Sequence, residues 1–68
     1  MENMRLLRLK FRKKQTEIAA HVGVSVTTYR RWEAGDQEPT FSQIRRLAEA
    51  FGLTSNRFFK FLIGGRLR

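Results

Sequence analysis

Gly23 separates two short segments whose apolar residues recur at the spacing of an α-helix. Two helices that cross through a three- or four-residue turn need a small residue where they touch and a glycine at the bend. Ala19 and Gly23 meet these two requirements, and Val24 is placed to fill the turn. The inward positions of the two segments are Ile18, Ala19, Val22, Tyr29 and Trp32. This pattern predicts a pair of short helices that cross at Gly23.

The first three predicted helices occupy the N-terminal half of the chain. Apolar residues at i, i+3 and i+7 predict a first helix from Asn3 to about Lys14. The two helices around the glycine are expected at about residues 15–21 and 26–33, with Ser25 as the N-cap of the second. The sequence of this half therefore predicts helices joined by tight turns.

Two more helices are predicted after a loop at residues 34–39, which contain glycine, proline and acidic residues. A capping-box pattern begins a fourth helix at Thr40, and Gly52 ends it. Either Thr54 or Ser55 caps a fifth helix. The apolar face of the fourth helix is Phe41, Ile44, Leu47, Ala48 and Phe51. No segment shows the alternation of a strand, so we expect an all-α, compact five-helix domain.

The length of 68 residues leaves room for one small domain, which we expect over residues 1–64, followed by a short basic tail at residues 65–68. There is no cysteine to form a disulfide or a thiolate metal site. No apolar run approaches the ~20 residues of a membrane span, and no secretory signal follows Met1. We therefore expect no membrane association and a cytoplasmic location near the nucleoid.

The charge of the chain points to a polyanionic partner. Fourteen Lys and Arg residues against six Asp and Glu residues give a net charge of +8. Neutralising phosphates releases counterions and drives affinity for nucleic acid. A ribosomal, RNA-binding or membrane-surface peptide has the same charge balance, so charge alone leaves these classes open.

Several segments together resemble the lambda-type repressor and Cro helix-turn-helix family. The segments are QTEIAAHVGVS at residues 15–25, WEAG at 32–35, Pro39 and RLAEAFG at 46–52. The resemblance covers about residues 4–63. It implies a five-helix domain with the helix-turn-helix at the second and third helices. It also implies a repressor-like, DNA-binding transcriptional regulator of phage or bacterial origin that forms a homodimer on a palindromic operator.

The resemblance also implies roles for single residues. Gln15 would bond a DNA phosphate, and Ser25 would cap the recognition helix, at about residues 26–33, and reach the DNA backbone. Arg8 and Glu33 would form an ion pair between the first and third helices. The base-reading positions of the family are occupied here by Val26, Thr27 and Arg31.

Helical spacing independently indicates that these base-reading positions lie on one exposed face of the third helix. With Tyr29 and Trp32 inward, its first turn offers Val26 and Thr27 to the major groove. A valine makes apolar contact, best with a thymine methyl, and Arg31 suits guanine O6 and N7. The remaining expected phosphate contacts are Lys14 and Arg30.

Two departures from the family pattern bear on its DNA contacts. Lys14 stands where the family has a Thr or Ser N-cap, so the second helix loses a cap worth ~1 kcal/mol. The loop after the third helix carries Asp36 and Glu38, where relatives often have basic groups. This acidic loop is expected to face away from DNA or toward a partner protein.

The sequence gives no basis for catalysis, a metal or a cofactor. The three serines lie at or near helix starts, and no carboxylate pair, cysteine or phosphate-binding glycine loop accompanies them. The single histidine, His21, is expected on the surface. We therefore expect that the protein is not an enzyme.

The segment at residues 57–63 carries more apolar bulk than one small core can cover. Together with Leu6 or Leu9 it would leave an exposed patch, which usually marks an interface. A homodimer would use such a patch, and so would an antitoxin or adaptor that binds a partner protein with the same fold. The alternative is that Phe61 and Ile63 only cover the end of the core.

Overall fold

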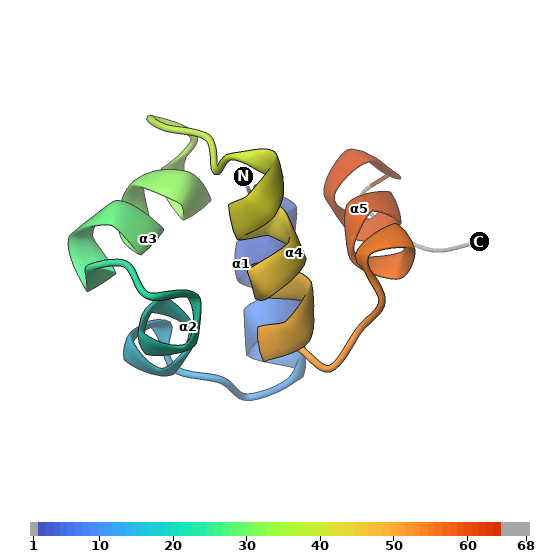
Figure 1. The fold of residues 1–68 in the computed structure, drawn as a ribbon, viewed down its shortest axis with the longest axis horizontal. Coiled ribbons are helices and arrows are strands. Elements are labelled where there is room, and N and C mark those ends of the chain that lie inside the picture. Colours follow the sequence, from blue (N-terminus) through green and yellow to red (C-terminus); the bar gives the residue numbers. More distant parts are fainter. Residues whose placement is uncertain (1, 65–68) are drawn as a thin grey trace.

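The computed structural model describes residues 2–64 and contains five helices over that range, with no strand (Figure 1). The all-α prediction is therefore confirmed. The predicted basic tail, residues 65–68, lies outside the described residues. The helices are α1 (Glu2–Lys10), α2 (Gln15–Val22), α3 (Val26–Ala34), α4 (Phe41–Ala50) and α5 (Ser55–Gly64).

Helix α4 lies in the middle of the domain, between α2 on one side and α5 on the other (Figure 1). Helix α1 lies behind it in this view and packs against α3 and α5. All five helices contribute side chains to one apolar core. Its buried members are Met4, Leu7, Ile18, Ala19, Val22, Tyr29, Trp32, Leu47, Ala48, Phe51 and Phe58.

The predicted caps are present at the starts of α3, α4 and α5. The Ser25 hydroxyl accepts an N–H from the first turn of α3 at 3.1 Å. Thr40 and Gln43 form a reciprocal capping box at α4, with bonds of 3.2 and 2.8 Å. At α5 the capping hydroxyl is that of Thr54, which decides between the two residues that the sequence offered.

Helix α1 ends at Lys10, so the prediction that it extends to about Lys14 is wrong. Arg12 has a φ of +56°, in the left-handed region that interrupts a helix. The N–H groups of Arg12 and Lys13 donate to carbonyls near the end of α1 at 3.1 and 3.0 Å, which is the Schellman arrangement. Glycine usually occupies the left-handed position that ends a helix, so the arginine at position 12 gave no sequence signal that α1 ends there.

The apolar face predicted for the fourth helix is buried only in part. Leu47 and Phe51 lie in the core, but Phe41 is 76% exposed and Ile44 is half-buried. Phe41, in the first turn of α4, lies outside the core, and Ile44, one turn later, only packs against it. Phe59 and Ile63 on α5 are also exposed, whereas Phe61 packs partly against the core.

Candidate nucleic-acid interface

The turn between α2 and α3 has the geometry that the sequence predicts. Gly23 has a φ of +89°, a conformation that is strained for any residue with a Cβ. The N–H groups of Gly23 and Val24 both donate to the Ala19 carbonyl, at 2.9 and 3.0 Å. A Cβ added at Gly23 would meet nothing within 4 Å. The glycine is therefore required for its backbone conformation, whereas the small buried Ala19 serves the close approach of the helices.

Helix α3 has one buried side and one open side. Tyr29 and Trp32 are fully buried, as predicted, and their rings meet edge to face at 6.1 Å. On the other side Thr27, Arg30 and Arg31 are exposed. This burial fixes the rotation of α3 about its axis and so determines which side chains a ligand can reach.

Val26 was expected on the side of the third helix opposite Tyr29 and Trp32, but it is only partly open. It is half-buried and packs against the core, because it begins α3 directly beside the turn that Val24 fills. Only part of its side chain is open to a ligand. Ser25, one residue earlier, is exposed although its hydroxyl caps the helix.

A series of hydrogen bonds connects α1, α2 and α3. Arg8 Nε donates to Glu33 Oε2 at 2.6 Å, and Arg8 Nη2 donates to Glu33 Oε1 at 3.3 Å. Gln15 Nε2 donates to the same Oε1 at 3.1 Å, while Gln15 Oε1 accepts from Arg30 Nε at 3.1 Å. The start of α2 is thereby joined to the side of α3 that carries the exposed arginines.

The carboxylate of Glu33 is ionised at neutral pH although it is buried. Burial opposes its ionisation, but hydrogen bonds, first of all that from Arg8, outweigh burial and keep the pKa of Glu33 below its usual value. The bond to Glu33 raises the pKa of Arg8 in turn. Burial, and then the nearby Glu33 carboxylate, raise the pKa of Tyr29. A buried charge pair thus lies directly behind the open side of α3.

Three consecutive cations lie in the loop between α1 and α2, directly before Gln15. Arg12, Lys13 and Lys14 are all exposed. Lys14 is the N-cap residue of α2 and makes no side-chain cap, as predicted, although its backbone N–H donates to Glu17 Oε1 at 2.7 Å. This bond to Glu17 is one half of a capping box, so it supplies part of the stabilisation that a side-chain N-cap would give.

The link from Gln15 to Glu33 and Arg30 was not predicted. The sequence analysis gave Gln15 only a phosphate contact. A glutamine at the start of a helix gives no local signal for a bond to residues 15 and 18 positions later. The structure brings Gln15 and Arg30 together, with Lys14 next to Gln15 in the chain, whereas Arg8 and Glu33 are largely shielded from solvent.

Residues 4–58, which are 55 of the 68 in the chain, match a protein family described as Helix-turn-helix. The chain belongs to this helix-turn-helix family. The family is that of the lambda repressor and Cro, so the resemblance in the sequence is confirmed. No curated protein matches the chain in sequence.

Membership of this family indicates what kind of ligand the domain binds. The helix-turn-helix family consists of DNA-binding regulatory domains, and this chain is a DNA-binding domain of that type. Within residues 2–64, no helix has the length and apolar character needed to cross a bilayer. In the same range, no group of three or more His, Cys, Asp or Glu residues is arranged to hold a metal ion.

Proposed function

We propose that the protein is a sequence-specific regulator that binds double-stranded DNA as a homodimer on a palindromic operator and represses transcription. The observation that carries this proposal is the orientation of α3. Burial of Tyr29 and Trp32 turns Thr27 and Arg31 outward, on the helix that follows the turn at Gly23. In such domains this second helix enters the major groove with its N-terminal residues against the base edges.

The base contacts proposed are those of Val26, Thr27 and Arg31. Arg31 is exposed and its guanidinium can donate two hydrogen bonds to guanine O6 and N7. The Thr27 hydroxyl can bond a base edge, and the open part of Val26 can contact a thymine methyl. Together these residues would read a few adjacent base pairs in each half-site.

The phosphate contacts proposed are those of Lys14, Gln15, Ser25 and Arg30. The Gln15 amide uses one of its two N–H groups on Glu33, which leaves the second for a phosphate oxygen. Arg30 uses Nε on Gln15 and retains its two terminal nitrogens for phosphate. These contacts would set the register of the domain on DNA without reading sequence.

The proposal gives the protein no catalytic role and requires no cofactor. DNA is the partner, and the proposed location is the cytoplasm, with the nucleoid. The charge of +8 supports a polyanionic partner, since the affinity of such a domain contains a large counterion-release term.

In vitro selection from random duplexes, run at a low and a moderate salt concentration, tests this function. We expect an enriched inverted repeat with half-sites about one helical turn apart, and affinity that falls steeply with salt. An Arg31→Glu variant, which is expected to fold normally, should enrich no such repeat. If the duplexes selected by the wild-type protein share no enriched sequence, sequence-specific binding is contradicted.

A further inference from the structure

The loop between α1 and α2 carries an unbroken run of positive charge. Arg12, Lys13 and Lys14 are consecutive and all exposed. Among the described residues, no ion pair and no side-chain hydrogen bond involves any of these three charged groups. The proposed phosphate contacts use Lys14 and leave Arg12 and Lys13 without a role. Clustered cations directly before the helix-turn-helix form a surface that can bind phosphates.

Hydrogen bonds of the backbone hold this loop in one conformation. The N–H groups of Arg12 and Lys13 donate to carbonyls near the end of α1 at 3.1 and 3.0 Å, and the N–H of Lys14 donates to Glu17 Oε1 at 2.7 Å. In addition, Arg8 Nη1 donates to the Lys13 carbonyl at 3.1 Å. A surface that is ordered before binding loses little conformational entropy when its ligand binds. The loop therefore presents its three cations without a large cost of ordering.

The same set of hydrogen bonds connects the loop to the proposed phosphate contacts. The Arg8 guanidinium that bonds the Lys13 carbonyl also bonds Glu33. Glu33 accepts from Gln15, and Gln15 accepts from Arg30. The loop, the start of α2 and the side of α3 thus form one hydrogen-bonded unit. A duplex held by Gln15 and Arg30 passes close to the loop, which directly precedes Gln15.

The length of the loop suits a stretch of DNA backbone. Three consecutive residues span about 7 Å from the first Cα to the last. Successive phosphates of one strand are about 3.4 Å apart along the duplex axis. The three cations can therefore neutralise two or three neighbouring phosphates. Arg12 and Lys13 are further from Gln15 along the chain than Lys14 is, so they reach phosphates beyond those that Gln15 and Lys14 contact.

The loop on the other side of the domain carries the opposite charge. Asp36 and Glu38 are exposed between α3 and α4. In Figure 1 the α1–α2 loop runs along the bottom of the domain and the α3–α4 loop along the top. Phosphates are attracted to the first loop and repelled by the second. A duplex held against α3 is therefore drawn to the domain on one side only.

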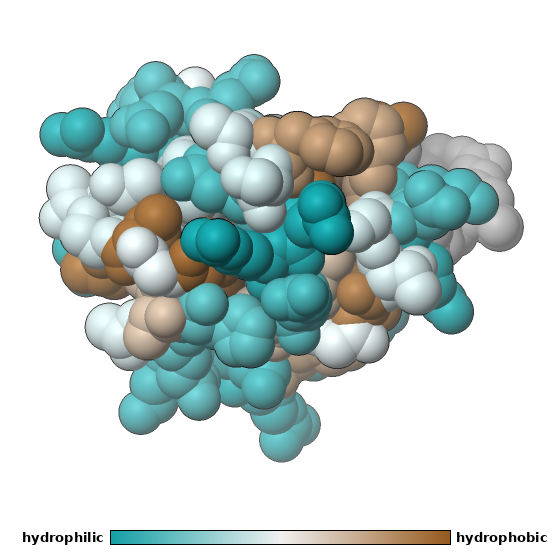
Figure 2. Space-filling model, in the orientation of Figure 1, coloured by the Kyte–Doolittle hydropathy of each residue, from teal (hydrophilic) through white to brown (hydrophobic). Residues whose placement is uncertain are grey.

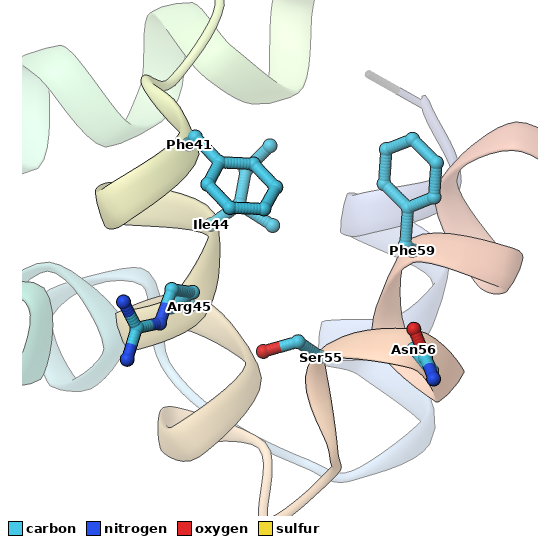
Figure 3. Close-up of a pocket in the computed structure, with 6 residues that line it drawn as sticks. All are labelled: Phe41, Ile44, Arg45, Ser55, Asn56 and Phe59. Carbon is cyan, nitrogen blue, oxygen red and sulfur yellow. The ribbon is translucent and has the colours of Figure 1, made fainter.

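The end of the domain furthest from α3 is apolar. Helices α3 and α5 lie at opposite ends of the 32 Å long axis (Figure 1). Between α4 and α5, Phe41, Ile44 and Phe59 line a groove of about 110 Å³ (Figure 3). In Figure 2 apolar side chains gather over the same ends of α4 and α5. A phosphate loses hydration on such a surface and gains no partner there, so DNA that extends past α3 is better bound by the α1–α2 loop.

We propose that the α1–α2 loop binds the phosphates that flank each half-site, with Arg12 and Lys13 as contacts beyond that of Lys14. This inference rests on the proposed function, because it requires a half-site that α3 reads. The flank is bound on one side of the half-site, that of the basic loop, and its sequence is not read. The loop therefore adds affinity without adding base specificity.

Duplexes with one selected half-site and random flanks of increasing length, on one side or the other, test this contact. We expect the affinity of the wild type to rise about tenfold as one flank is lengthened and to stay constant as the other is lengthened. The loop variant, Arg12→Gln with Lys13→Gln, should lose this rise and keep its preference for the selected bases. Its slope of log affinity against log salt should be lower by about 2, because two phosphate contacts are removed.

Arg57→Gln with Lys60→Gln is the matched control, because it removes the same two kinds of charge from exposed positions on α5. It should keep the full dependence on the flank. The bonds at positions 12 and 13 are made by backbone atoms, so the loop variant retains them, and thermal melts check that both proteins fold. The proposal is overturned if the loop variant keeps the flank dependence, if the control loses it equally, or if both flanks raise affinity alike.

Neutral methylphosphonate groups at single positions of the duplex identify the phosphates involved. Neutralising a phosphate just outside the half-site, on the side of the active flank, should weaken binding of the wild type and leave that of the loop variant unchanged. If no flanking phosphate behaves in this way, the loop does not bind the flank.

The ratio of affinities for the selected half-site and a scrambled one tests the proposed function separately. A ratio near one contradicts sequence-specific regulation. If the loop variant then still lowers the salt slope on random DNA, while the α5 control does not, the loop stands as a phosphate-binding surface. An unchanged slope contradicts both proposals.

Discussion

Arg8 on α1 and Glu33 on α3 are joined by two hydrogen bonds, of 2.6 and 3.3 Å, with only 12% and 6% of their side chains exposed. A two-bond contact of this kind fixes direction as well as distance. It therefore holds α3 at one angle to the rest of the domain. Gln15 bonds the same carboxylate, so the start of α2 is held by the same group.

Glu33→Gln tests the contribution of this pair to stability through pH. The pKa of Glu33 is lowered on folding, so its charge stabilises the fold above the unfolded value of 4.5, and this is lost as pH falls through the folded value. We expect the variant to lose about 1–3 kcal/mol of unfolding free energy near neutral pH, and less in acid. Urea denaturation at a series of pH values measures the difference in unfolding free energy between the wild type and the variant. Glu49→Gln, at an exposed position, is the control and should lose almost no unfolding free energy at any of these pH values.

Arg31→Ala tests base recognition. Loss of a bidentate contact to guanine should cost ~1–3 kcal/mol of binding free energy on the selected site and relax discrimination at one base pair. Fluorescence anisotropy with the four bases at that position measures both effects. Equal weakening on all four duplexes would make Arg31 a phosphate contact.

Arg30→Ala is expected to behave differently, because Arg30 is assigned to phosphate. Affinity should fall by a similar factor on every duplex, and the slope of log affinity against log salt should decrease by about 1. Gln15→Ala should have a smaller effect of the same kind, since it removes the hydrogen bond that holds Arg30. Non-additive losses in the double variant, measured by the same titrations, would show that the two residues act together. Strict additivity would mean that Gln15 does not position Arg30.

Arg12→Gly tests the unusual end of α1. A residue with a Cβ in the left-handed region costs about 1–2 kcal/mol that glycine does not incur, although glycine also gains entropy in the unfolded chain. We expect a net rise in unfolding free energy of up to about 1 kcal/mol, measured by urea denaturation. Lys13→Gly, next to it but without a positive φ, should destabilise the fold.

Lys14→Ser separates stability from DNA affinity. Lys14 has N-cap geometry, with φ −90° and ψ 150°, and Glu17 already accepts its backbone N–H. A serine would complete the capping box and raise the unfolding free energy by about 0.5–1 kcal/mol. The same change should weaken DNA binding and lower the salt slope by about 1, because it removes the proposed phosphate contact. Lys60→Ser on α5 removes the same charge and should leave specific DNA binding unchanged, while it lowers the unfolding free energy slightly because serine is a poorer helix former than lysine.

The parts of the fold that the sequence predicted well have local causes. A glycine is needed where φ is positive at Gly23, and hydroxyl caps are needed at Ser25 and Thr40. Each requirement is met within a few residues of chain. The buried and open sides of α3 follow from the same short-range spacing.

The parts that could not be predicted depend on distant contacts or on unusual residues. Arg12 adopts a conformation that its residue type disfavours, so the end of α1 was placed too late. The bonds of Gln15 to α3 depend on how the helices cross. Periodicity showed which face of the fourth helix is apolar, but not that the core ends before Phe41.

The side chain of Asn3 donates from Nδ2 to the carbonyl of Leu62 at 3.0 Å, across 59 positions of sequence, where α1 packs against α5. Helix α1 therefore has no completed surface until α5 has been synthesised. Folding must then wait for nearly the whole chain, and the five helices are expected to lose their protection against hydrogen exchange together rather than one after another.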